Sequence, residues 1–329
     1  MPITIFRPSG DGPHPLVVVN HGRNSAARAE MARWRPEHMA RYLVAKGFVV
    51  MAPTRVGYGE TAGDFDPESS GTCSRMRVEP LSIAASDQVL ATVEFAKTLP
   101  YVDASRWLVA GSSVGGLAAV ATVGRNPAGL VGGINFAGGI GAGPNVPPGK
   151  PCGAAEIERY WNALAKTAVA PMVWLYWRND QSWGERHPVQ WHKAWVQGGG
   201  KADFVVMPSV GSDGHGGMVA DMESWLPVVD GFLSGLGFKQ PAIVPRPASS
   251  GFARVDEVER VPLRPHGRQT GYAKFLEIKH PRAFAIGEGG AFGWATGDYA
   301  HGRALGFCQR SGQSCKLYAV DDEVVWLGR

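Results

Sequence analysis

The chain has 329 residues, of which 44% are hydrophobic and 19% are charged, a balance that excludes a disordered protein and indicates one large domain or two smaller ones. Its formal net charge is only +4, from 33 Lys and Arg against 29 Asp and Glu. Because the sequence also has no basic tract, it gives little support for nucleic acid or an anionic membrane as a partner. The longest apolar stretches, at residues 16–19 and 47–53, are far too short for a membrane-spanning helix.

Strand-like and helix-like patterns alternate over the first 238 residues. A short edge strand is expected at Ile3–Phe6, and apolar runs typical of buried core strands follow it at residues 16–20, 48–52, 107–110, 131–136, 172–176 and 203–207. Helix patterns cover residues 31–46, 82–99, 117–123 and 218–236. The alternation predicts an α/β fold, with a mostly parallel central sheet and helices on both faces.

The composition changes near residue 239. Residues 239–250 hold three prolines and few core residues, which predicts a linker between a main domain at residues 1–238 and a small module at residues 251–329. Within the module, strand patterns at 283–286, 316–320 and 324–327 and a helix pattern at 299–309 predict an α+β fold.

A G-x-S-x-G motif follows the strand pattern at residues 107–110. It reads Gly111-Ser112-Ser113-Val114-Gly115 and precedes a helix pattern. This strand–turn–helix setting is typical of a nucleophile elbow, in which flanking glycines permit a strained turn that exposes the serine hydroxyl. Ser113 is therefore the predicted nucleophile; the alternative is a glycine-rich turn without chemistry.

A serine nucleophile needs a base, because a free hydroxyl reacts poorly near neutral pH. His215 lies in a glycine-rich loop between the last core strand pattern and the last helix of the main domain. Such a loop can bring an imidazole over the serine, so His215 is the predicted base; the alternative is a solvated loop residue. The other eight histidines fit this role less well.

The third catalytic group should be an acid that follows a late strand. Asp180 comes after the strand pattern at 172–176, where it would orient the His215 imidazole. Glu185 and Asp213 compete for this role, although Asp213 is only two residues from His215 and is better suited to shaping the turn. A loop acid that caps a turn is the alternative for Asp180.

Attack on a carbonyl also needs two N–H groups that hold the oxyanion. The Val114 amide, directly after the nucleophile, is one predicted donor. The backbone amide of Arg23, in the turn after residues 16–20, is the other, with His21 bracing this turn. The alternative is a simple turn at the end of a strand.

Taken together, these motifs resemble those of the α/β-hydrolase superfamily, and within it those of the dienelactone hydrolase-like group. The resemblance rests on His21-Gly22, the Gly111–Gly115 motif, Asp180 and Asp213-Gly214-His215. The resemblance covers about residues 2–238. It implies an eight-stranded sheet, no cofactor, and hydrolysis of esters or related acyl bonds. Dienelactone hydrolases carry cysteine as nucleophile, whereas Ser113 stands here, so a serine esterase is favoured over a dienelactone hydrolase.

Three further residues are predicted to border the substrate. Trp183 follows Asp180 closely and could line an acyl or aromatic pocket, with ordinary packing as the alternative. Tyr58, between two glycines after the second core strand pattern, is placed beside the pocket, with a plain turn as the alternative. His21 is placed there because it adjoins the oxyanion turn.

The four cysteines lack the C-x-x-C spacing of a structural zinc site, so no metal is predicted. Cys73 and Cys152 fall in loops expected on the active-site side of the sheet, and we expect them to pair; two free thiols are the alternative. Cys308 and Cys315 can pair over a C-x6-C spacing. Two bridges would indicate an oxidising compartment, periplasmic or secreted. No signal peptide is visible, and removal of an upstream segment stays open.

These predictions favour a serine carboxylesterase that acts on a small-molecule ester through an acyl-enzyme. A peptidase or amidase would use the same groups, and a non-catalytic binding protein on a hydrolase scaffold is a third alternative. The module at 251–329 carries no catalytic set; docking, substrate presentation and simple stabilisation stay open for it, as does the oligomeric state.

Overall fold

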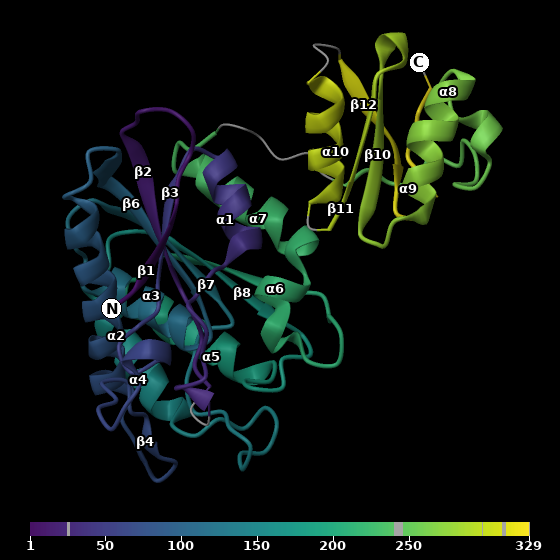
Figure 1. The fold of residues 1–329 in the computed structure, drawn as a ribbon. Coiled ribbons are helices and arrows are strands. Elements are labelled where there is room, and N and C mark those ends of the chain that lie inside the picture. Colours follow the sequence, from purple (N-terminus) through teal and green to yellow (C-terminus); the bar gives the residue numbers. More distant parts are fainter. Residues whose placement is uncertain (25–26, 240–245, 298, 311–313, 329) are drawn as a thin grey trace. The chain divides into compact units, whose positions relative to one another are not determined.

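The computed structural model describes residues 1–24, 27–239, 246–297, 299–310 and 314–328. The chain forms two compact units, one before and one after residues 240–245 (Figure 1). These six residues belong to the predicted linker and lie outside the described residues, so the linker stays a prediction. Among the described residues, no helix combines the length and the apolar character needed to cross a bilayer.

The first unit is built on a central sheet with the strand order β1-β3-β2-β6-β7-β8-β9. The strands are β1 Ile3–Phe6, β2 His14–Asn20, β3 Val49–Pro53, β6 Val102–Ser112, β7 Leu130–Phe136, β8 Met172–Trp177 and β9 Ala202–Met207. Only β1, at the edge, runs antiparallel to its neighbour. The α/β fold with a mostly parallel sheet is thus confirmed. The expected eighth strand is not found in the described residues, because β1 pairs directly with β3 and alone forms that edge.

Helices cover both faces of this sheet. They are α1 Glu37–Ala45, α2 Val78–Ala96, α3 Val114–Gly124, α4 Ala154–Ala165, α5 Arg186–Gln197, α6 Gly217–Ala220 and α7 Met222–Gly235. One face packs its alternate side chains, such as Val18 and Val109, into a core with α2, α3, α4 and α5. The other face meets α1 and α7, which also contact each other through Tyr42 and Trp225.

Two predicted helices of the first unit differ from the structure, and two further helices were not predicted. The helix expected at 31–46 begins only at Glu37, because Pro36 lacks an N–H and restricts the residue before it. The helix expected at 218–236 is interrupted at Asp221, whose backbone is not helical. Helices α4 and α5 were not predicted, and their tryptophans are buried against β8.

The second unit contains an antiparallel sheet with the strand order β11-β10-β12-β13. Its elements include α8 Pro265–Gly267, α9 Ala273–Glu277, β10 Arg282–Gly287, β11 Phe292–Thr296, α10 Ala300–Gln309, β12 Cys315–Val320 and β13 Glu323–Val324. Helix α10 packs on one face, where Ala283 and Ala304 are buried, and Tyr272 and Phe275 pack on the other. The predicted α+β character is therefore found, although β11 was not predicted.

Candidate active site

Ser113 occupies the sharp turn between β6 and α3. Its backbone has φ 57° and ψ −122°, a strained conformation for a residue with a side chain. The two motif glycines make the turn possible. A methyl group on Gly111 would come within 2.2 Å of the Gly115 oxygen, and one on Gly115 within 2.3 Å of the Asn20 oxygen. The turn therefore projects the serine hydroxyl at the carboxyl end of the sheet, as a nucleophile elbow does.

His215 reaches this hydroxyl from the loop after β9. Its Nε2 lies 3.0 Å from Ser113 Oγ, and its side chain is 22% exposed. Asp213 shapes the loop, because its Oδ1 accepts hydrogen bonds from the backbone N–H groups of His215 and Gln181. Asp213 is thus placed as a turn-shaping residue rather than as the partner of the imidazole.

Asp180 lies on the other side of the imidazole, after β8. Its Oδ2 is 3.1 Å from His215 Nδ1, and its side chain is fully buried. Its Oδ1 accepts the backbone N–H groups of Ser182 and Trp183 at 2.8 and 3.1 Å, which fixes the carboxylate. The competing Glu185 is exposed. Ser113, His215 and Asp180 thus form one hydrogen-bonded chain of side chains that can pass a proton from the hydroxyl to the imidazole.

The turn after β2 lies against the nucleophile. A methyl group on Gly22 would come within 3.2 Å of Ser113 Cβ and 3.8 Å of its Oγ. The Arg23 guanidinium forms an ion pair with Asp66, with Nη2 2.6 Å from Oδ2, so this side chain is held away from an oxyanion role. The arrangement is compatible with the Arg23 and Val114 amides as oxyanion donors, and their assignment stays a prediction.

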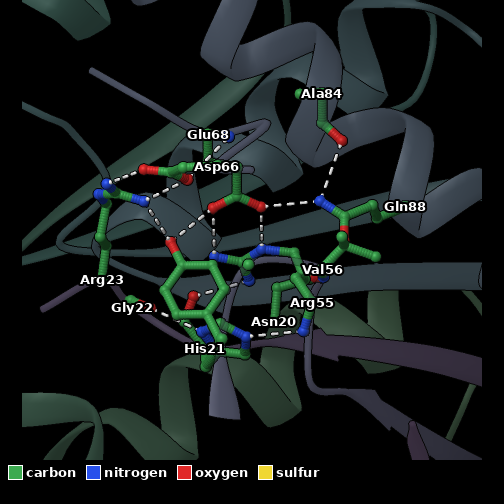
Figure 2. A network of polar contacts seen from close by, with 12 residues as sticks. Asn20, His21, Gly22, Arg23, Arg55, Val56, Asp66, Glu68, Ala84 and Gln88 are labelled. Carbon is green, nitrogen blue, oxygen red and sulfur yellow. Dashed lines mark hydrogen bonds and ion pairs between the residues drawn. The ribbon is translucent and has the colours of Figure 1, made fainter. Parts of the chain in front are cut away.

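His21 is buried and takes part in a polar network behind this turn (Figure 2). Its Nε2 accepts the Arg55 N–H at 3.1 Å, so the ring proton is on Nδ1, which donates to the Gly22 oxygen at 2.6 Å. Burial, and secondarily the charge of Arg55, hold the pKa of His21 well below its usual value. The ring is therefore a neutral brace of the turn.

Tyr58 is also buried in this network. Its hydroxyl donates to Glu68 Oε2 at 2.7 Å and accepts from Arg23 Nη1 at 3.1 Å. Burial and the nearby Glu68 carboxylate raise the pKa of Tyr58 to about 12. The placement of His21 and Tyr58 in the substrate pocket was wrong, because both rings are packed beneath the turn by these hydrogen bonds and do not line the cleft described next.

A cleft of 330 Å³ opens over the serine. Ser113, His215, Val114, Arg23 and Trp183 contribute to its walls. The rings of Trp183 and His215 pack in a T-shaped arrangement with centroids 5.1 Å apart, and Trp183 Nε1 donates to the Ala137 oxygen at 2.7 Å. Trp183 therefore forms part of the cleft wall and is held there by this hydrogen bond, and its role in a substrate pocket stays a prediction.

A disulfide forms another part of the cleft wall. Cys73, between the short strands β4 Gly71–Thr72 and β5 Arg75–Met76, pairs with Cys152 before α4. The bridge joins two loops far apart in sequence, and the predicted pairing is confirmed. In the second unit, Cys308 and Cys315 also pair, as expected. Among the described residues, no cluster of three or more His, Cys, Asp or Glu side chains could hold a metal ion.

Arg55, Glu68 and Asp66 were missed by the sequence analysis, although they surround the turn after β2 that carries the predicted oxyanion donor. One signal was present: Arg55 follows an apolar strand pattern almost directly, and a charged residue in that position needs a partner. The partner could not be identified, because Glu68 lies in a loop without a recognisable pattern.

The neutral state of His21 predicts a pH dependence of stability. Below pH about 6.5 the unfolded chain protonates His21 while the folded chain does not, so stability is lost as the pH falls, by up to about 1.4 kcal/mol per pH unit. We expect the unfolding free energy of a His21→Gln variant to fall less steeply than wild type between pH 7 and 5. Urea unfolding followed by tryptophan fluorescence measures both slopes, and equal slopes would contradict the prediction.

Residues 11–194, more than half of the chain, match the model of a family described as serine aminopeptidase, S33. No curated protein gives a significant match. A Klebsiella pneumoniae subsp. pneumoniae protein, described as a dienelactone hydrolase, is structurally similar with TM-score 0.48 and 20% identity, covering 73% of this chain and 93% of that chain.

Two peptidases are also similar in structure. Dipeptidyl peptidase 4 from Porphyromonas gingivalis matches with TM-score 0.51 and 18% identity, over 71% of this chain and 33% of that chain. Acylaminoacyl peptidase from Pyrococcus horikoshii matches with TM-score 0.51 and 13% identity, over 70% of this chain and 39% of that chain. The chain thus spans well under half the length of these two peptidases, and at such identities the likeness shows the fold alone.

Proposed function

The chain belongs to the S33 serine aminopeptidase family of serine hydrolases, which have the α/β-hydrolase fold, and from this we propose that it is a serine carboxylesterase acting on small-molecule esters. The superfamily predicted from the sequence is confirmed by this match. The observation that carries the proposal is the chain of contacts from Ser113 through His215 to the buried Asp180.

In the proposed reaction, Ser113 Oγ attacks the ester carbonyl while its proton passes to His215 Nε2. The carbonyl electrons move onto the oxygen, which is held by the Arg23 and Val114 amides. When this oxyanion collapses, the carbon–oxygen bond to the alcohol breaks, and the imidazolium returns the proton to the leaving alkoxide. Water then attacks the acyl-enzyme with His215 as base and releases the acid. Asp180 holds the imidazole in position and stabilises its positive charge.

The composition of the cleft favours an ester over an aminopeptidase substrate. An aminopeptidase must bind a protonated amino group, which requires carboxylates or other acceptors near the nucleophile. Among the described residues that line the cleft, none is Asp or Glu, and the one permanently charged side chain is that of Arg23. A peptidase remains the second candidate, because the family description names aminopeptidases.

A paired substrate assay tests this choice. We expect p-nitrophenyl esters to be cleaved with kcat/KM at least about 100-fold above p-nitroanilides of the same acyl group, a difference of about 2.7 kcal/mol in activation free energy. A series of acyl lengths would define the size limit that the cleft imposes. Faster cleavage of aminoacyl p-nitroanilides with a free amino terminus would instead indicate a peptidase. Absence of labelling by a fluorophosphonate would favour a binding protein.

We also propose that the protein works in an oxidising compartment, periplasmic or extracellular. The two disulfides support this, because such bonds persist mainly outside the cytosol. The role of the second unit beside the proposed esterase stays open.

A further inference from the structure

A fully buried pair of opposite charges lies behind the turn at residues 21–23, which carries the proposed oxyanion donor Arg23. The side chains of Arg55 and Glu68 are both 0% exposed, and they form a two-point ion pair, with Nε 2.6 Å from Oε1 and Nη2 3.2 Å from Oε2. Figure 2 shows the guanidinium and the carboxylate facing each other at the centre of the network. Since a buried ion pair is on average no more stabilising than well-packed apolar residues, stability alone does not account for it.

The remaining contacts of Arg55 converge on one residue of the turn. Its Nη1 donates to the His21 backbone oxygen at 2.9 Å, and its backbone N–H donates to His21 Nε2 at 3.1 Å. Arg55 thus holds both the main chain and the ring of His21. A lysine could not replace it, because one ammonium cannot bind the two carboxylate oxygens in a planar fork and also reach the His21 oxygen.

On its opposite side the turn rests on the nucleophile elbow. A methyl group on Gly115 would come within 2.6 Å of the His21 oxygen, and Gly22 stands beside Ser113. The His21 carbonyl is therefore held between the Arg55 guanidinium and the backbone of the G-x-S-x-G motif. A shift of the guanidinium would move the turn that carries the Arg23 amide.

Glu68 is itself fixed at both oxygens. Oε1 accepts from Gln88 Nε2 at 3.0 Å, and Oε2 accepts from the Tyr58 hydroxyl at 2.7 Å. Figure 2 shows the Gln88 amide beside one end of the Glu68 carboxylate, while the Arg55 guanidinium faces both of its oxygens. Gln88 is anchored on α2, so the network ties the turn to a rigid helix. Rigid support of this kind is what keeps catalytic donors in their productive geometry.

We infer that Arg55, held by Glu68, is a positioning residue for the hydrolysis: it fixes the His21-Gly22-Arg23 turn so that the Arg23 amide meets the oxyanion of the tetrahedral intermediate. Neither side chain lines the cleft, so the pair acts through the turn and not on the substrate. This inference rests on the proposed function. It means that the buried Arg55–Glu68 pair affects the rate of hydrolysis although neither side chain touches the substrate.

The chain offers a closely matched control. Asp230 on α7 also accepts from a cation and a tyrosine, with Lys46 Nζ and the Tyr42 hydroxyl 2.7 and 2.9 Å from its Oδ1. None of these three residues lines the cleft or contacts the oxyanion turn in the described contacts. Asp230→Asn therefore removes a comparable buried charge without disturbing the turn.

The experiment compares Arg55→Lys, Glu68→Gln and Asp230→Asn in the full chain. We expect Arg55→Lys and Glu68→Gln to lower kcat for a p-nitrophenyl ester by about 10- to 100-fold with KM within about threefold, because an oxyanion donor acts in the transition state. Their inhibition constants for an alkyl boronic acid, which forms a tetrahedral adduct with a serine, should rise by the same factor. Asp230→Asn should lower Tm similarly and keep wild-type kcat and boronate affinity.

Other results would overturn the inference. A wild-type kcat in the folded Arg55→Lys and Glu68→Gln variants would contradict it. A rise in KM without a loss of kcat would also contradict it, and so would a loss of kcat with unchanged boronate affinity. If Arg55→Lys does not fold, Glu68→Gln decides, because it keeps the shape of the side chain. Failure of the proposed function would be seen separately, as ester hydrolysis that persists in Ser113→Ala.

Discussion

Replacing Ser113 by alanine is expected to lower kcat for ester hydrolysis by about 10⁴- to 10⁶-fold. The substitution removes the atom that forms the acyl-enzyme, while His215, Asp180 and the oxyanion donors remain. A small residual rate over water is expected from those groups. Steady-state rates with a p-nitrophenyl ester, together with fluorophosphonate labelling, measure the effect.

The neighbouring Ser112 provides the control. Ser112→Ala deletes the same oxygen one residue earlier, at the end of β6, where the side chain does not line the cleft. This variant should retain labelling and turnover close to wild type. If Ser113→Ala hydrolysed esters at a near-normal rate, Ser113 could not be the nucleophile and the proposed mechanism would have to be abandoned.

Asp180→Asn is expected to lower kcat by about 10⁴-fold. An asparagine can still accept the N–H groups of Ser182 and Trp183, so the loop should keep its shape. Its amide would then donate to His215 Nδ1, which leaves the ring proton on Nε2. An imidazole in that tautomer cannot accept the Ser113 proton, so the loss should fall on kcat while the fold is kept.

The Asp213→Asn variant tests whether Asp180 or the competing Asp213 orients the His215 imidazole. Its side-chain oxygen would still accept from His215 and Gln181, so the turn should persist with a far smaller loss of activity. Circular dichroism and Tm confirm that both variants are folded. A larger loss of kcat in Asp213→Asn than in Asp180→Asn would exchange the two assignments.

With the roles inferred for Arg55 and Glu68, the site has three parts, and each part holds the next in position. In the proposed mechanism the cleft residues meet the substrate and the turn after β2 supplies a backbone donor, while the buried pair holds that turn against the nucleophile elbow. Such support explains why two opposite charges are kept in a place where apolar side chains would be no less stable.

The sequence by itself determined the α/β architecture and pointed to Ser113, His215 and Asp180, which the fold joins by hydrogen bonds. Buried parallel strands are continuous apolar runs that can be read locally, and the G-x-S-x-G motif lies between such a run and a helix pattern. In this fold the carboxyl ends of parallel strands meet at one edge, so loops after successive strands can be placed beside one another before any contact is seen. Asp180 and His215 were found in that way, and Cys73 and Cys152 were expected on the same side.

Only the tertiary structure decided what surrounds those three residues. Tyr58 was assigned to the pocket because it follows a core strand, and His21 because it adjoins the predicted oxyanion turn. Both rings instead turn inward to Glu68 and Arg55. The Arg55–Glu68 ion pair could not be predicted either, because Glu68 lies in a loop without a periodic pattern and no local signal links the two residues. Burial and pairing of charge depend on contacts between distant segments, so they are settled only when the chain has folded.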